Sequence, residues 1–385
     1  MHAYVERRVL ASIAVPALTV ALALAQVVAP QRGAIAPRPL VSSVAPAATS
    51  GMLVRPIRVI SGDETIVLDE QALAPIARLE PGAFDTLLAS IAARFDRQAR
   101  DAELRAAAAG FAVVPASEGL LVDRADLAKQ LVAALYSGGA RSVVRPRVAA
   151  APATLSTERL AATALVSEFT TYFPRDAARA TNIKLAASRF DGQVVKPGQS
   201  FSFWDRLGDV SYEAGFVDAG AIIDRRSDKA LAGGICQVST TLFNAVARAG
   251  YQIDERHAHS YYIERYPIGL DAAVLFPAED FRWTNDTADP VLIRTSADDT
   301  SVAFRLYSLP SGRVVSFGTP VQRNLVLPAT DQPADPAHAA GYVVRGRDVV
   351  VTWTVSEDDV VLHGDSWTSH YSPVWGGPAP ALTVR

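Results

Sequence analysis

The sequence is poor in cysteine and in net charge. Its 385 residues include one cysteine, so no intramolecular disulfide can form and cysteine-rich zinc or iron–sulfur sites are excluded. Thirty-seven Lys and Arg residues nearly balance 40 Asp and Glu residues, which gives a net charge of −3. A chain with this balance lacks the excess of positive charge that binds nucleic acid, so we expect no nucleic-acid partner.

The composition is that of a globular chain. Hydrophobic residues make up 49% and charged residues 20% of it, which excludes collagen-like and wholly disordered proteins. The length predicts two compact domains plus tails, at about 150 residues per domain.

The N-terminal segment predicts export. Arg7 and Arg8 precede an uncharged stretch, residues 9–29, that is long enough to span a bilayer as a helix. Ala23-Leu24-Ala25 also has the small-x-small spacing of a signal-peptidase site. We interpret residues 1–29 as a signal peptide or membrane anchor, with a buried core helix as the alternative. Either targeting interpretation places the rest of the chain outside the cytoplasm.

Residues 30–54 are rich in Ala and Pro and predict an extended tether. Residues 55–152 predict a small α+β domain, with strands at 57–60 and 65–68, a helix after Gly82 and a helix capped by Asp123. The runs Arg100-Asp101-Ala102 and Val114-Pro115-Ala116-Ser117-Glu118-Gly119 in it resemble the peptidoglycan-binding domain of YoaR-like exported bacterial proteins. That resemblance implies binding to wall glycan or peptides.

Residues 153–310 predict a second, mixed α+β domain. We expect a helix over about 156–172, another over about 176–190, and then strands around Pro197-Gly198. Further on, residues 253–263 predict a strand, and another strand begins near Gly269. Residues 291–295 and 302–307 predict a β-hairpin.

The only cysteine lies where a helix begins. Gly233 and Gly234 precede Cys236, and the spacing of Val238, Leu242 and Val246 is helical. The positive end of a helix stabilises a thiolate, and glycines let a substrate carbonyl approach the backbone closely. We therefore predict a reactive thiol, with substrate binding by Gly233, Gly234, Gln237 and Ser239.

Histidine and aspartate residues follow Cys236 in the chain order of a cysteine hydrolase. His257 and His259 follow the cysteine on one strand face, and Asp271 follows at the start of the next predicted strand. Nucleophile, base and orienting carboxylate come in this order in papain-like hydrolases. The predicted catalytic set is Cys236, His259 and Asp271, with neither metal nor cofactor.

Other interpretations of these residues stay open. Cys236 can be a small buried hydrophobic residue, each histidine an ordinary strand residue, and Asp271 a turn residue after Gly269. A third arrangement joins Cys236, His257 and His259 as zinc ligands.

The order of motifs in this region resembles the VanW family. The motifs that carry the resemblance over about residues 182–307 are Phe201-Ser202-Phe203, Gly215-Phe216, Gly233-Gly234-Ile235-Cys236-Gln237-Val238-Ser239, Glu255-Arg256, His259-Ser260, Tyr266-Pro267, Gly269, Asp271-Ala272 and Asp280 to Asn285. Two positions depart from the usual pattern: Ala232 stands in place of a third glycine and Ala273 in place of a threonine. The resemblance implies a bacterial envelope protein and does not define a reaction.

Residues 311–385 predict a β-rich extension with a hairpin over 349–363. We expect its aromatic residues Trp367, Tyr371 and Trp375 to be exposed, where they either stack on sugars or pack, and His338, His363 and His370 to lie at the surface. The whole chain predicts an α+β cell-envelope protein. It either performs cysteine-dependent acyl transfer or amide hydrolysis on wall peptides, or it is a non-catalytic peptidoglycan-binding scaffold or accessory module.

Overall fold

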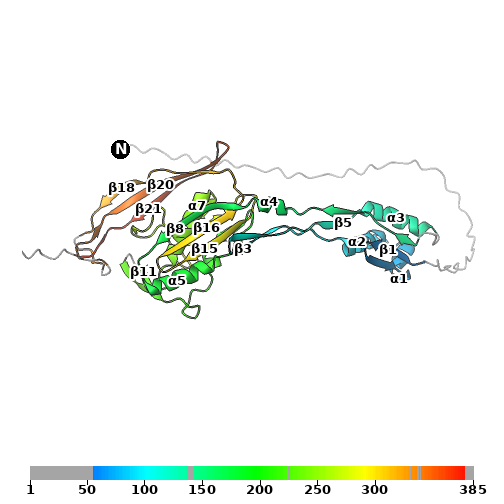
Figure 1. The fold of residues 1–385 in the computed structure, drawn as a ribbon, viewed down its shortest axis with the longest axis horizontal. Coiled ribbons are helices and arrows are strands. Elements are labelled where there is room, and N and C mark those ends of the chain that lie inside the picture. The colour runs from blue at the N-terminus through cyan, green and yellow to red at the C-terminus, as the bar shows by residue number, and fades with distance from the viewer. Residues whose placement is uncertain are drawn as a thin grey trace, which may run out of the picture. The chain divides into compact units, whose positions relative to one another are not determined.

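Small β-sheets and short helices alternate along the chain (Figure 1). The computed structural model describes residues 55–137, 142–223, 226–329, 331–335, 338 and 340–377. The predicted signal or anchor and tether, residues 1–54, lie outside these residues. In the part described, no helix is long and apolar enough to cross a membrane.

Three small sheets and three helices make up the first part of the described chain. Its elements are β1 (Ile57–Ser61), β2 (Glu64–Leu68), α1 (Glu70–Ala77), α2 (Ala83–Phe95), β3 (Glu103–Ala107), β4 (Gly110–Val114), β5 (Gly119–Val122), α3 (Arg124–Tyr136), β6 (Val143–Val144) and β7 (Val148–Ala151). The sheets are β2-β1-β6, β3-β4 and β5-β7. The predicted strands and both predicted helices are confirmed, whereas α1 was not predicted. Val59, Ile91 and Leu127 belong to the core between the helices and β1.

Asp123 caps α3 as the sequence predicts. Its carboxylate accepts the backbone N–H of Asp126 at 2.9 Å. We expect Asp123→Ala to lower the free energy of unfolding by about 1 kcal/mol, because an unpaired N–H is then left at the helix start. Urea denaturation measures the loss, with Asp63→Ala in the exposed β1–β2 turn as control. Equal stability of the two variants would contradict the capping role.

The middle part is built on one antiparallel four-stranded sheet, of order β8-β16-β15-β9. Its elements are α4 (Thr157–Ala161), β8 (Ala164–Tyr172), α5 (Ala177–Ser188), β9 (Val194–Val195), β10 (Ser200–Ser202), α6 (Phe203–Leu207), β11 (Asp218–Ile223), β12 (Arg226–Leu231), α7 (Ile235–Ala249), β13 (Gln252–Glu255), β14 (Arg282–Thr284), β15 (Val291–Ala297) and β16 (Ser301–Ser308). The helix α7 packs over β8 and β16, and α5 packs over β15 and against α7 (Figure 1).

The long helix predicted over 156–172 is wrong. Ser156 does cap a helix, but α4 ends at Ala161 and the following residues form β8. Valine, threonine and aromatic residues favour a strand there, and pairing with β16 along the whole of β8 decides the outcome. The helix predicted over about 176–190 is confirmed as α5.

A long hairpin dominates the last part. Its elements are β17 (Val314–Phe317), β18 (Val321–Val326), β19 (Val343–Val344), β20 (Gly346–Glu357), β21 (Val360–Tyr371) and β22 (Val374–Trp375). Alternate residues of β20, such as Val351 and Trp353, are buried in the main core. The predicted hairpin is confirmed and is longer than expected. Trp367 and Tyr371 are only 7% and 4% accessible, so their expected exposure is wrong and the alternative that they pack is confirmed.

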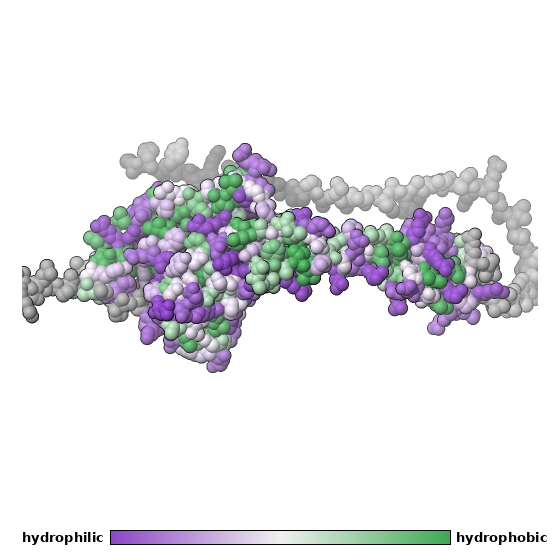
Figure 2. All heavy atoms as spheres, in the orientation of Figure 1, coloured by the Kyte–Doolittle hydropathy of each residue, from purple (hydrophilic) through white to green (hydrophobic). Residues whose placement is uncertain are grey.

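Packing connects the first part of the chain to the middle sheet. Leu104 on β3 shares a buried cluster with Leu160 and Leu292, and the rings of Phe111 and Tyr307 lie 5.6 Å apart. Val54–Arg385 form one compact unit, while the predicted domain limits at 152 and 310 stay predictions. The mixed α+β class is confirmed. Hydrophilic and hydrophobic residues are interleaved on the face shown in Figure 2.

Candidate active site

Two glycines lead the chain into α7. Gly234 is the residue before the helix and has φ of 117°, which favours glycine. A Cβ on Gly233 would lie 2.3 Å from the backbone oxygen of Ala219 in β11, so only glycine fits. Ala232, where the VanW family usually has glycine, also has a positive φ of 63°. This entry places Cys236 in the first turn of α7 as predicted, near the positive end of the helix.

One face of α7 holds the segment that carries the carboxylate. Cys236 Sγ donates to the backbone oxygen of Val274 at 3.5 Å, Thr240 Oγ1 to that of Ala272 at 3.2 Å and Asn244 Nδ2 to that of Leu270 at 2.7 Å. These three residues are four apart and therefore line one helix face. Residues 270–274 run along this face, so Asp271 is fixed close to the helix that bears the thiol.

The predicted strands in this region are largely wrong. The strand expected over 253–263 ends at Glu255 in β13, and only His257 and Ala273 form a bridge beyond it. The strand expected from Gly269 is absent from the described structure, because side chains of α7 bind its backbone in place of a neighbouring strand.

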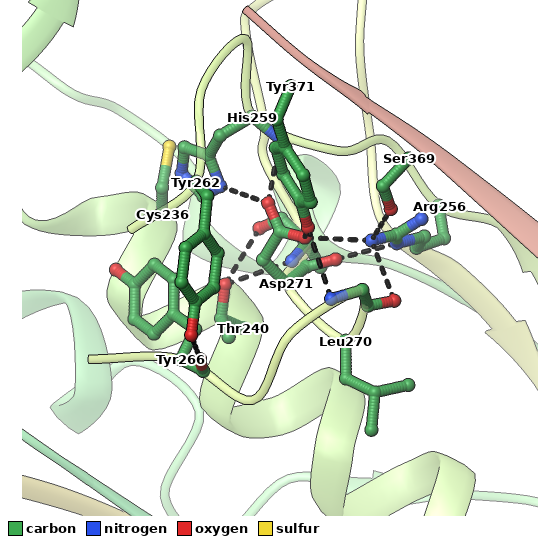
Figure 3. Close-up of polar contacts among 12 residues, drawn as sticks. Cys236, Thr240, Arg256, His259, Tyr262, Tyr266, Leu270, Asp271, Ser369 and Tyr371 are labelled. Carbon is green, nitrogen blue, oxygen red and sulfur yellow. Dashed lines mark hydrogen bonds and ion pairs between the residues drawn. The ribbon is translucent and has the colours of Figure 1, made fainter. Parts of the chain in front are cut away.

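Asp271 is a buried carboxylate with four donors. Its Oδ2 accepts the backbone N–H and the ring Nδ1 of His259, both at 2.7 Å. Its Oδ1 accepts Nη2 of Arg256 at 2.9 Å and the hydroxyl of Tyr371 at 2.6 Å. Figure 3 shows His259 lying between this carboxylate and the sulfur of Cys236. The three predicted catalytic residues are thus brought together.

The hydrogen bond to Asp271 fixes the orientation of the His259 ring. With Nδ1 on the carboxylate, the other ring nitrogen is free to exchange a proton with the thiol. Tyr266 stacks on the imidazole, with 5.6 Å between ring centroids. The arrangement is that of a thiol, a base and an orienting carboxylate.

Charges within this buried set shift the pKa of each member. Burial raises the pKa of Asp271, but the hydrogen bond and charge of His259 and the charge of Arg256 outweigh burial and lower it to about 2. Burial lowers the pKa of His259, but Asp271 and Cys236 raise it to about 9. Burial raises the pKa of Cys236, yet His259 holds that pKa below its ordinary value. Together these shifts favour a thiolate–imidazolium pair.

Gln237 and Ser239 are fully buried within α7 and its surroundings. The amide nitrogen of Gln237 donates to Thr171 and to the backbone oxygen of Tyr172, while its oxygen accepts Arg179. Ser239 Oγ has no hydrogen-bond partner among the described residues. Contact of these two residues, or of Gly233 and Gly234, with a substrate stays a prediction.

His257 does not join the set. Its Nε2 lies 2.9 Å from Glu255 Oε1, whereas His259 faces Asp271. In the described residues, no group of three or more His, Cys, Asp or Glu side chains is placed to hold a metal ion. The zinc arrangement of Cys236, His257 and His259 is therefore not formed.

Three neighbours of the site were not predicted as site residues. Arg256, Tyr266 and Tyr371 contact Asp271 or His259. Arg256 and Tyr266 belong to the VanW motifs Glu255-Arg256 and Tyr266-Pro267, so membership of these motifs was the signal that could have identified them as site residues. Tyr371 lies 100 residues after Asp271, and no sequence spacing connects the two.

The remaining aromatic and histidine predictions have mixed outcomes. Trp375 is partly buried, with its indole N–H on the backbone oxygen of Gln332 at 2.7 Å. His370 is exposed, as predicted, and pairs with Asp348. His363 is only 18% exposed at its side chain, where it bonds Asp286, and His338 stacks on Tyr342. The partner of His363 is distant in sequence, whereas Tyr342 lies only four residues after His338.

Comparison with known proteins agrees with both sequence resemblances. Residues 178–307 match a family model described as VanW like protein, and residues 54–143 match one described as "Putative peptidoglycan binding domain". The chain carries a VanW-like domain preceded by a domain of this peptidoglycan-binding family. Cys236, His259 and Asp271 all lie within the VanW-like match. The two matches support an association with the cell wall.

Two relatives show the same relationship. The chain is 34% identical over 199 residues to the uncharacterized protein YoaR of Bacillus subtilis (strain 168), which covers 51% of this chain and 65% of the relative. It is 26% identical over 134 residues to the vancomycin B-type resistance protein VanW of Enterococcus faecalis (strain ATCC 700802 / V583), covering 33% and 48%. The chain thus spans less than two thirds of either relative. No solved structure gives a significant match.

Proposed function

We propose that this protein is an extracytoplasmic cysteine enzyme that transfers or hydrolyses acyl groups of peptidoglycan peptides. The observation that carries the proposal is the buried arrangement in which Asp271 orients His259 beside Cys236. A lowered thiol pKa next to a raised imidazole pKa is what a thiolate nucleophile and its proton donor require.

The reaction follows from the groups in place. The Cys236 thiolate attacks the amide carbonyl carbon, and the positive end of α7 stabilises the oxyanion that forms. His259 gives its proton to the leaving amine as the C–N bond breaks, which leaves a thioester on Cys236. His259 then takes a proton from water or from a second amine, and the attack of that molecule releases the acyl group and the thiolate.

The substrate class rests on the domain matches. A peptidoglycan-binding domain in the same chain supports wall peptides as the source of the amide bond. One relative is named as a vancomycin resistance protein, which also supports a role at the bacterial wall. Export through residues 1–29, with membrane attachment if that segment is retained, belongs to the same proposal.

A second function is a non-catalytic module that binds peptidoglycan. The match of residues 54–143 favours it independently of Cys236. In that case the cysteine contributes only to packing against Val274 and the core around α7.

The test is Cys236→Ser, which nearly preserves shape and removes the thiolate. We expect this variant to bind isolated peptidoglycan as the wild type does, but to release or exchange no wall peptides. Mass spectrometry of the soluble products and of the digested wall measures the reaction, and thermal unfolding checks the fold.

His257→Gln is the matched control, because His257 pairs with Glu255 outside the set. We expect it to retain activity. Equal product yields from wild type and Cys236→Ser would overturn the cysteine enzyme and favour the binding module.

A further inference from the structure

One arginine approaches the turn that carries the thiol. Arg179 lies in the first turn of α5, where its backbone N–H is capped by Asp176 at 3.1 Å. A Cβ on Gly234 would lie 3.4 Å from Arg179 Cγ, so the arginine stem packs against the residue two before Cys236. Its Nη2 donates to Gln237 Oε1 at 2.8 Å, immediately after the cysteine.

Neutral groups are the only hydrogen-bond acceptors that the described structure gives this guanidinium. Nη1 donates to the backbone oxygen of Gly220 at 3.1 Å, and Nη2 donates to the amide of Gln237. Its Nε is buried and has no acceptor among the described residues. Arg256 and Arg313, which are also buried, each pair with an aspartate instead.

Hydrogen bonds to neutral groups hold Arg179 in place. Gln237 is itself fixed by bonds to Thr171 and Tyr172, so the guanidinium has a firm support. Burial lowers the pKa of Arg179 and the positive charge of Arg265 adds to that effect, whereas the charges of Tyr266, Cys236 and Asp176 act in the opposite direction. Arg265, which is exposed, is therefore a second cation near the partly buried Arg179.

We propose that Arg179 binds a carboxylate of the substrate beside Cys236, so that the peptide attacked carries a free carboxylate close to the scissile bond. Nη1 and Nη2 each donate one of the hydrogen bonds described, to a neutral acceptor, so each keeps a second N–H that suits a carboxylate in geometry and in charge. Gln237 is then a positioning residue that acts through Arg179. This inference rests on the proposed function, whose substrate class it narrows.

A substrate with a free carboxylate next to the scissile bond is cleaved at its last peptide bond. The thiolate attacks the carbonyl that precedes the carboxylate-bearing residue, and the C–N bond breaks. That residue leaves as an amino acid with the proton from His259. Water completes a carboxypeptidase reaction, or a second amine completes a transpeptidation.

The test compares two alkylating reagents of similar size. Iodoacetate carries a carboxylate and iodoacetamide does not, and both form the S–C bond to Cys236 with loss of iodide. We measure the ratio of their rate constants, iodoacetate over iodoacetamide, on the pH plateau of each variant. The ratio removes the influence of Arg179 on the amount of thiolate.

We expect the wild-type ratio to exceed that of N-acetylcysteine amide in solution, and Arg179→Gln to lower it about tenfold, as loss of a charged hydrogen bond does. Arg179→Lys should fall between them. Arg248→Gln is the control for charge, since Arg248 also has no ion pair among the described residues, but it is exposed and lies at the other end of α7, about 18 Å along the helix.

The possible outcomes distinguish failure of the carboxylate site from failure of the proposed cysteine enzyme. An equal ratio in wild type and Arg179→Gln overturns the carboxylate site, even if iodoacetamide reports a low thiol pKa. A ratio that depends on Arg179 supports the site, even if the thiol titrates normally and the enzyme proposal fails. Equal losses in Arg179→Gln and Arg248→Gln would show a general charge effect and overturn the assignment.

Discussion

Replacing Asp271 with alanine is expected to lower the free energy of unfolding by about 3–5 kcal/mol, the cost of leaving a buried charge without its partner. Arg256 is 4% exposed at its side chain and has Asp271 as its carboxylate partner. The same change removes the acceptor for His259 and for the Tyr371 hydroxyl. Urea denaturation at pH 7 measures the loss.

Two comparisons sharpen this prediction. Asp348→Ala, which removes the carboxylate partner of exposed His370, should leave the unfolding midpoint near that of the wild type. A loss no greater for Asp271→Ala than for Asp348→Ala would show that the buried network does not stabilise the fold.

The pH dependence of wild-type stability follows from the same carboxylate. Its pKa falls from 3.8 to about 2 on folding, so the folded state binds this proton less readily than the unfolded state. The stabilisation is complete above about pH 4 and is lost as the pH falls towards 2. In Asp271→Ala this part of the acid dependence should be missing.

Alkylation of Cys236 by neutral iodoacetamide is expected to be fast at pH 6 and to depend on His259. An ordinary thiol with a pKa of about 8.5 is well under 1% thiolate at that pH. Because His259 holds the pKa of Cys236 down, His259→Gln should slow alkylation at pH 6 by about tenfold or more. The two rates should converge as the pH rises further, because the thiol of the variant then ionises as well.

His257→Gln supplies the control for this experiment. It lies two residues away and pairs with Glu255, so it should alkylate with the wild-type pH profile. A wild-type profile that rises only near pH 8.5, or equal slowing in both histidine variants, would contradict a thiolate stabilised by His259.

The sequence predicted which three residues come together better than it predicted the backbone that carries them. The glycines and helical spacing placed Cys236 in a first helical turn, and chain order pointed to His259 and Asp271. The strands assigned to His259 and Asp271 were wrong, because side chains on α7 hold residues 270–274 in place of a strand ladder. Local sequence patterns do not predict such tertiary contacts.

For the fold as well, elements specified by local residues were predicted and elements that depend on distant partners were not. Hairpins and capped helices were predicted where turn and cap residues specify them locally, as at Asp123 and in β20–β21. The segment 164–172 was assigned to a helix because its strand character depends on pairing with β16, more than 120 residues later in the chain. Buried Tyr371 was taken as exposed for the same reason.

Because Tyr371 donates to Asp271, the hydrogen bonds of the site are complete only after Tyr371 has been synthesised. Cys236, His259 and Asp271 leave the ribosome well before β21, which supplies the fourth donor to the carboxylate. A nascent chain in which β21 has not yet been made therefore holds the thiol beside an Asp271 that lacks one of its four donors. The complete network forms only when β21 has been made, so the synthesis of a distant hairpin sets its last step.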